Sequence, residues 1–195
     1  MPGAYSLRAV MPRPDRIEGL AIVSVEGMIA DAQGIQPPSL KLEADQQFFR
    51  AECARADVLA HGRYSSEGGP HFDGRRRLVL TRQIPALAPD PANPKGLLWN
   101  PAGASLDQAW EALGLSGGLL IVTGGTDGFG LFLTLGYDVF HLTRAAHARL
   151  PGGRPVFPGV PARTPEELLA AHGLKPGATR VLDASEGVKL VSWTR

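Results

Sequence analysis

The sequence predicts an α/β fold in which a mixed, mostly parallel central sheet of about eight strands is flanked by helices. Apolar runs of strand length, such as Ile17–Ser24 and Gly118–Thr123, contain few polar residues and suit central strands covered on both faces. Amphipathic helical segments alternate with these runs, which is typical of parallel sheets. The last segment, Thr179–Arg195, contains two β-rich runs joined by Ala184–Gly187, and this predicts a C-terminal antiparallel hairpin.

The helices are predicted from local signals. In the segment Leu42–Ala56, apolar residues recur at i, i+4 and i+7, which leaves Glu52 and Arg55 to face solvent. Two further helices begin with capping boxes, formed by Ser105 with Gln108 and by Thr164 with Glu167. The other predicted elements are a helix at about Thr126–Leu135 and strands at Asp57–His61, Arg77–Thr81, Gly96–Trp99 and Tyr137–Thr143.

The length and composition predict one domain. A chain of 195 residues with 44% hydrophobic residues can bury one sizeable core and is short for two. Residues 1–15 are polar and interrupted by proline, so we expect an N-terminal arm followed by a single domain over residues 16–195.

The charge and cysteine content favour a small-molecule protein. A formal net charge of +1 gives no electrostatic reason to expect a nucleic acid or a membrane surface as partner. The single cysteine excludes an intrachain disulfide, and the five histidines have no metal-ligand spacing, so no metal site is predicted. No apolar run has the length of a signal peptide core or a membrane span, and we expect a cytoplasmic location.

The segment Ile121–Gly130 carries the main functional signal. An apolar run breaks into Gly124 and Gly125 and is followed by the start of a helix. Such a turn presents backbone N–H groups at the positive end of the helix, with no side chain to keep a pyrophosphate away. The alternative is that the glycine pair only lets the chain turn sharply.

Four motifs in order resemble the dihydrofolate reductase-like superfamily, and in particular the reductase domain of riboflavin biosynthesis and its stand-alone relatives. They are SVEGMIA at 24–30, ADVLAHGRYSS at 56–66, LIVTGGTDG at 120–128 and LPGGRPVFPG at 150–159. The resemblance covers roughly residues 16–195 and implies the dihydrofolate reductase-like fold. It also implies an NADPH site at the carboxyl ends of the strands, a small-molecule substrate and a homodimer.

The resemblance implies which residues bind the cofactor. The expected cofactor-binding residues are Gly62, Arg63, Ser65, Thr81, Arg82, Thr123, Gly124, Gly125 and Thr126. Arginine suits the adenosine 2′-phosphate because its planar fork matches phosphate geometry. Hydride transfer in related reductases is accompanied by a proton, and the candidate acids are Asp45, in the first helix, and Glu26, after the first strand.

The expected function is an NADPH-dependent reductase that transfers a hydride to a C=N or C=O bond of a pterin-like, pyrimidine-like or ribitylated substrate. One alternative is the riboflavin-pathway reduction of a 5-amino-6-(5-phosphoribosylamino)uracil-type compound. Another is a nucleotide-binding module without catalysis. The chain keeps Pro70 but lacks the aspartate that usually precedes it in riboflavin-pathway reductases, and it lacks the tryptophan of folate reductases between Gly27 and Pro38. The acceptor therefore stays open.

Overall fold

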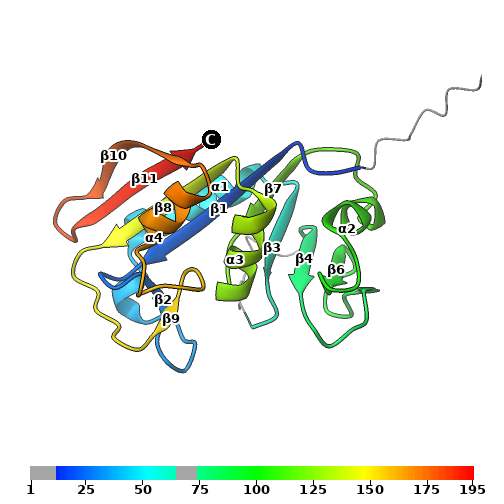
Figure 1. Cartoon of the computed structure of the whole chain (residues 1–195), viewed down its shortest axis with the longest axis horizontal. Coiled ribbons are helices and arrows are strands. Elements are labelled where there is room, and N and C mark those ends of the chain that lie inside the picture. Colours follow the sequence, from blue (N-terminus) through cyan, green and yellow to red (C-terminus); the bar gives the residue numbers. More distant parts are fainter. Residues whose placement is uncertain (1–11, 65–73) are drawn as a thin grey trace, which may run out of the picture.

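A computed structural model describes residues 12–64 and 74–195 of the chain. A nine-stranded sheet, in the order β10-β11-β8-β1-β7-β3-β4-β6-β5, runs through the whole described part (Figure 1). Its strands are β1 (Arg16–Val23), β3 (Val58–Gly62), β4 (Arg77–Leu80), β5 (Leu87–Pro89), β6 (Gly96–Trp99), β7 (Leu119–Val122), β8 (Val139–Ala145), β10 (Lys175–Asp183) and β11 (Val188–Thr194). The helices are α1 (Glu43–Arg55), α2 (Leu106–Ala112), α3 (Thr126–Leu135) and α4 (Pro165–Ala171), with a 3-10 turn, η1, at Pro38–Leu40.

The sheet is mixed and mostly parallel, as the sequence predicts. Strands β8, β1, β7, β3, β4 and β6 are parallel neighbours, whereas β11 pairs antiparallel with β8 and β10, and β5 pairs antiparallel with β6. The central strands are mostly apolar on both faces because helices cover both, although buried polar residues such as Glu18 of β1 and His61 of β3 interrupt them. The C-terminal hairpin is formed by β10 and β11, joined by residues 184–187.

The helices divide between the two faces of the sheet. Figure 1 shows α3 and α4 in front of the sheet and α1 behind it. The front core is the larger and contains aromatic residues of α3, such as Phe129 and Phe132, with Leu168 and Leu169 of α4. Behind the sheet, Cys53 of α1 packs on Leu20, Leu59 and Ile121. One face of the sheet therefore depends on a single helix, and that helix also forms a wall of the cavity described below.

Both predicted capping boxes are present. The Ser105 hydroxyl accepts a hydrogen bond from the Gln108 N–H at 3.1 Å, and the Gln108 side chain accepts one from the Ser105 N–H at 2.8 Å. Thr164 and Glu167 make the same pair of bonds at 3.1 and 2.8 Å. These helix starts are fixed by residues three apart in sequence, so the sequence is sufficient to locate them.

Several short elements escape sequence prediction. The sheet has nine strands where about eight are expected, because the proline-rich segment after β4 contains β5. Two more strands, β2 (Met28–Ala30) and β9 (Arg154–Pro155), pair in a separate two-stranded sheet. A strand of two or three residues has no readable alternation, so only its pairing with a distant segment defines it.

The prediction that Glu52 faces solvent is wrong. Its side chain is 17% exposed and lies beside Glu18 of β1 and His141 of β8. The face of α1 that meets the sheet carries Asp45, Phe48 and Glu52, three or four residues apart, so polar residues share it with apolar ones. Arg55 is about half exposed, as expected.

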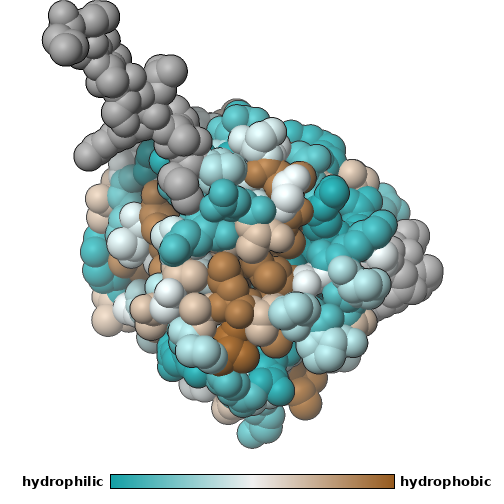
Figure 2. Space-filling view, turned by 90° about the vertical axis from the view of Figure 1, so that its right-hand side faces the viewer, coloured by the Kyte–Doolittle hydropathy of each residue, from teal (hydrophilic) through white to brown (hydrophobic). Residues whose placement is uncertain are grey.

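Residues 1–11 of the expected arm lie outside the described residues. Asp15 is tied to the sheet, because its carboxylate accepts a hydrogen bond from the Gly118 N–H at 2.7 Å. Figure 2 views the side of the molecule that carries α2 and β6, where hydrophobic residues form a central band framed by hydrophilic ones. Within residues 12–64 and 74–195, no helix has the length and apolarity required to cross a membrane.

Candidate functional site

A cavity of about 1050 Å³ opens at the carboxyl ends of the parallel strands. Its lining includes residues at the ends of β3, β4 and β7, the turn after β7, and one face of α1. Loops that leave adjacent parallel strands diverge at this edge of an open sheet, and ligands bind in the crevice between them. We refer to this cavity as the cleft.

The glycine turn between β7 and α3 lines the cleft. Thr123, Gly124, Gly125 and Thr126 all belong to its wall. Gly125 has φ +85°, a conformation that favours glycine because a Cβ would be strained there. The first helical hydrogen bond of α3 runs from the Phe129 N–H to the Gly125 carbonyl at 2.8 Å. The N–H groups of the first three helical residues therefore have no intrahelical acceptor and can bind an anion in the cleft.

The two threonines of this turn use their hydroxyl groups within the protein. Thr126 Oγ1 donates to the Pro155 carbonyl of β9 at 2.5 Å. Thr123 Oγ1 donates to the Ala60 carbonyl of β3 at 3.4 Å. These bonds hold the turn against its neighbours, so the backbone rather than the hydroxyls is available to a ligand.

The other expected cofactor residues reach the cleft from β3 and β4. The Gly62 N–H donates to the Gly124 carbonyl at 3.3 Å, which brings the two glycine loops together. Arg63 and Thr81 line the same wall, and Arg63 is exposed. Arg82 also lines the cleft, with its guanidinium 2.6 Å from Asp127 of α3. Ser65 lies outside the described residues.

Asp45 is the buried carboxyl group of the cleft. It sits in the first turn of α1, it is 7% exposed, and its side chain is hydrogen-bonded to Thr143 of β8. Burial raises the pKa of Asp45 to about 6, although the hydrogen bond from Thr143 opposes the rise. A carboxyl group with this pKa exchanges its proton near neutral pH, as a general acid must.

Glu26, the other candidate acid, is not among the residues that line the cleft. Its carboxylate accepts hydrogen bonds from the Ser24 hydroxyl at 2.7 Å and from the Leu150 N–H at 2.9 Å. The bonds from Leu150 and Ser24 lower the pKa of Glu26 and keep it ionised. Glu26 therefore links the turn between β1 and β2 to the segment before β9 through hydrogen bonds. Of the two candidate acids, Asp45 is the one that lines the cleft.

The sequence reasoning missed several residues of the lining. They include Arg50, Tyr64, His141, Thr143 and Arg154. A signal for two of them is readable: His141 and Thr143 are polar residues two apart that alternate with the apolar Phe140 and Leu142, so they share one face of the strand. For Arg154 no local signal exists, because its place in the cleft depends on the pairing of β9 with β2.

No model of a protein family matches this sequence, and no curated protein matches it. Solved structures do resemble it. A protein assigned to riboflavin biosynthesis from Shewanella sp. PV-4 superposes with TM-score 0.62 and 19% identity, covering 92% of this chain and 98% of that one. Dihydrofolate reductase from Enterococcus faecalis, solved with NADP(H) and RAB-propyl, gives TM-score 0.61 and 17% identity over 92% and 96% of the two chains.

A diaminohydroxyphosphoribosylaminopyrimidine deaminase/5-amino-6-(5-phosphoribosylamino)uracil reductase from Thermotoga maritima gives TM-score 0.58 and 17% identity. The superposition covers 93% of this chain and 56% of that longer one. Identities at this level establish the fold and leave the activity to be argued from the site. The order of strands, the antiparallel C-terminal hairpin and these likenesses together show that the chain has the dihydrofolate reductase-like fold.

Proposed function

We propose that this protein is an NADPH-dependent reductase that transfers a hydride to a C=N or C=O bond of a pterin-like or pyrimidine-like substrate. The observation that carries the proposal is that one cleft is lined both by the side-chain-free turn before α3 and by the buried carboxyl group of Asp45. The backbone N–H groups of the turn can bind a diphosphate, and the Asp45 carboxyl group can donate a proton.

The chemistry of the cleft wall fits a phosphorylated dinucleotide. Three backbone N–H groups at the start of α3 can bind the diphosphate, while Arg63 and Arg82 can reach the 2′-phosphate. The cavity of about 1050 Å³ slightly exceeds the range of about 300–1,000 Å³ typical of small-molecule sites, which suits a cofactor and a substrate together. When bound, NADPH would supply the hydride.

Asp45 is proposed as the proton donor, with Thr143 as the residue that positions it. A protonated Asp45 can donate to the nitrogen or oxygen of the double bond whose carbon accepts the hydride, so the product gains one hydride and one proton. An ionised Asp45 can instead accept two parallel N–H donors from an amino-substituted ring. The first role serves C=N and C=O bonds alike, whereas the second favours a flat, nitrogen-rich substrate over a simple carbonyl compound.

The proposal is tested by following NADPH oxidation with a panel of acceptors. The panel contains dihydrofolate, dihydropterins and 5-amino-6-(5-phosphoribosylamino)uracil, the last because one structural neighbour carries that compound in its name. With the accepted substrate, turnover should fall as pH rises above about 6, because Asp45 loses its proton there. Asp45→Asn should reduce kcat at least about a hundredfold, the lower range of general acid catalysis, while NADPH still binds.

A fluorescence titration with NADPH separates the proposal from its rival. Binding of NADPH without oxidation by any acceptor of the panel would favour a nucleotide-binding module that lacks catalysis. Absence of NADPH binding in the wild-type protein would refute the reductase. A homodimer and a cytoplasmic location, which the resemblance and the single cysteine suggest, belong to the same proposal.

A further inference from the structure

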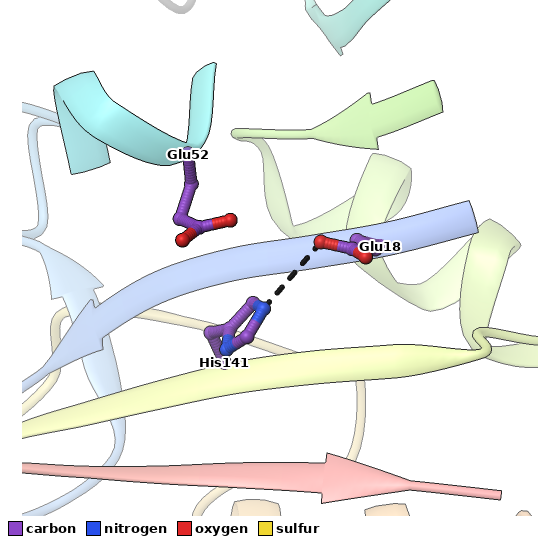
Figure 3. Close-up of side chains that lie close together, drawn as sticks. All are labelled: Glu18, Glu52 and His141. Atoms are coloured by element: carbon purple, nitrogen blue, oxygen red, sulfur yellow. Dashed lines mark ion pairs between the residues drawn. The ribbon is translucent and has the colours of Figure 1, made fainter. Parts of the chain in front are cut away.

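Three side chains that can bind a metal ion meet on the α1 face of the sheet. Glu18 comes from β1, His141 from β8 and Glu52 from α1, and one possible ligand atom of each lies within 4.8 Å of the others. Figure 3 shows Glu52 descending from the helix toward the carboxylate of Glu18, with the imidazole of His141 on the adjacent strand. The sequence separates these residues by 34 to 123 positions, so ligand spacing cannot reveal the group.

The distance between His141 Nε2 and Glu18 Oε2 is close to the distance between two ligand atoms of one zinc ion. His141 Nε2 lies 3.5 Å from Glu18 Oε2. Ligands at about 2.0–2.2 Å from a tetrahedral zinc ion are roughly 3.3–3.5 Å apart, so these two atoms need little movement to share one. The same separation is long for a hydrogen bond between nitrogen and oxygen.

Glu18 contributes a buried oxygen that lacks a hydrogen-bond donor. Its side chain is 1% exposed, and Oε1 is held by Arg16 Nε at 2.5 Å. Among the described residues, Oε2 accepts no hydrogen bond, although it points toward His141 and lies 3.6 Å from Arg55 Nη1. A buried carboxylate oxygen without a donor is costly, and a cation at bonding distance would remove that cost.

The imidazole of His141 is held in the orientation that a metal ligand needs. Its Nδ1 lies 2.8 Å from Ser192 Oγ of β11, and the Phe48 ring packs edge-on against it with centroids 5.3 Å apart. When Nδ1 donates its proton to Ser192, the lone pair of Nε2 points toward Glu18. Metal-binding histidines are commonly fixed in this way through their second nitrogen.

Two arginines now neutralise this group: Arg16 pairs with Oε1 of Glu18, and Arg55 lies between Glu18 and Glu52. The guanidinium of Arg55 contacts Glu52 and lies 3.6 Å from Glu18, at the last turn of α1. Its side chain is 52% exposed, so it can withdraw into solvent at little cost. The position between the two carboxylates is therefore already one that a positive charge occupies.

We propose that Glu18, Glu52 and His141 bind one Zn²⁺ ion and that Arg55 moves aside when the ion enters. One imidazole and two carboxylates are ligands that suit zinc, and three protein ligands leave a coordination position for water. Magnesium is disfavoured because it takes oxygen ligands in a strict octahedron. His141 also lines the cleft, so the ion would lie beside the proposed substrate region without any role in holding NADPH.

The test is isothermal titration of the untagged full chain with ZnCl₂ at pH 7.5, without NADPH, so its result does not depend on the reductase proposal. Wild-type protein should bind one ion with micromolar affinity. Glu52→Gln, which keeps the size of the side chain on the face of α1 that meets the sheet, and His141→Ala should each weaken binding at least tenfold. Arg55→Gln should strengthen it several-fold, because it removes the competing cation. His147→Ala, an exposed histidine elsewhere, is the matched control and should bind like wild type.

Co²⁺ provides a second readout, because its visible absorption reports nitrogen and oxygen ligands. The absorption should appear with wild type and with Arg55→Gln and should be lost with Glu52→Gln, whose fold is checked by circular dichroism. The proposal is overturned if neither wild type nor Arg55→Gln binds zinc. It is also overturned if Glu52→Gln and His141→Ala bind as wild type does, or if His147→Ala abolishes binding.

Discussion

Replacing Asp45 by Asn should make the protein more stable at neutral pH, although it should damage the proposed activity. The unfolded protein releases the Asp45 proton near the ordinary value of 3.8, whereas the folded protein retains it until about pH 6. Between these values the folded state binds more protons than the unfolded state, so the free energy of unfolding falls as pH rises. Above pH 6 the folded protein carries the full cost of an ionised carboxylate that is 7% exposed.

The size of the effect follows from the shift in pKa. A rise of about two pKa units, at about 1.4 kcal/mol per unit, corresponds to roughly 3 kcal/mol at most. Asparagine has the same shape, carries no charge and can still accept the hydrogen bond from Thr143 through its amide oxygen. The Asn variant should therefore match wild type near pH 4 and gain up to about 3 kcal/mol by pH 7 to 8.

Urea unfolding of both proteins at each pH from 4 to 8 measures this difference, and subtracting the two curves removes the contribution of all other groups. Glu43→Gln is the matched control on the same helix, since hydrogen bonds from Gln47 and Arg50 and the charge of Arg50 lower the pKa of that exposed carboxyl. Its replacement should not produce a gain with rising pH. A difference curve for Asp45→Asn that is flat from pH 4 to 8, or that falls, would refute the reasoning.

Four further predictions concern the cofactor turn, the arginines and assembly. Arg63→Ala and Arg82→Ala should each weaken NADPH binding more than NADH binding in fluorescence titrations, and equal losses would show that neither reaches the 2′-phosphate. Asp127→Asn should tighten NADPH binding several-fold, because it frees Arg82 from an ion pair at 2.6 Å and removes a negative charge beside the proposed diphosphate site. Weaker NADPH binding by this variant would contradict the prediction. Gly125→Val should lower the free energy of unfolding in urea by about 1–3 kcal/mol, because φ is +85° there and a side chain is strained in that conformation. It should also weaken NADPH binding, so an unchanged NADPH titration would count against the turn as the diphosphate site. If the protein is a homodimer, light scattering at micromolar concentration should give twice the mass of one chain. The mass of a single chain would refute the homodimer.

The cofactor side of the cleft could be predicted from the sequence because its signals are local. The glycine pair at 124–125 follows an apolar strand and precedes a helix, and Arg63 follows directly on the glycine at the end of β3. Parallel strands place such loops at one edge of the sheet, so the loops meet even when the order of the strands is unknown. The hydroxyl partners of Thr123 and Thr126, which are the Ala60 and Pro155 carbonyls, could not be predicted, because they are distant in sequence.

The acid side of the cleft could be predicted only in part. Asp45 and Glu26 were equivalent candidates in the sequence, since each is a carboxylate near the end of an early element. Burial beside Thr143 raises the pKa of one, and hydrogen bonds from Leu150 and Ser24 lower the pKa of the other. Ser24 is only two positions from Glu26, but Thr143 and Leu150 lie about 100 positions or more from their acids, so no short window along the chain contains them.

What the sequence by itself determined is the set of local elements: the apolar central strands, the capped helices, the glycine turn and the C-terminal hairpin. Each depends on residues within a few positions of one another, where backbone geometry dictates the pattern. Only the tertiary structure decided that β1 lies between β7 and β8, which brings Glu18 to His141 and sets α1 over both. Periodicity states which face of a strand is buried, but the pairing of strands is chosen by the packing of the whole core, and the proposed zinc site exists only through that choice.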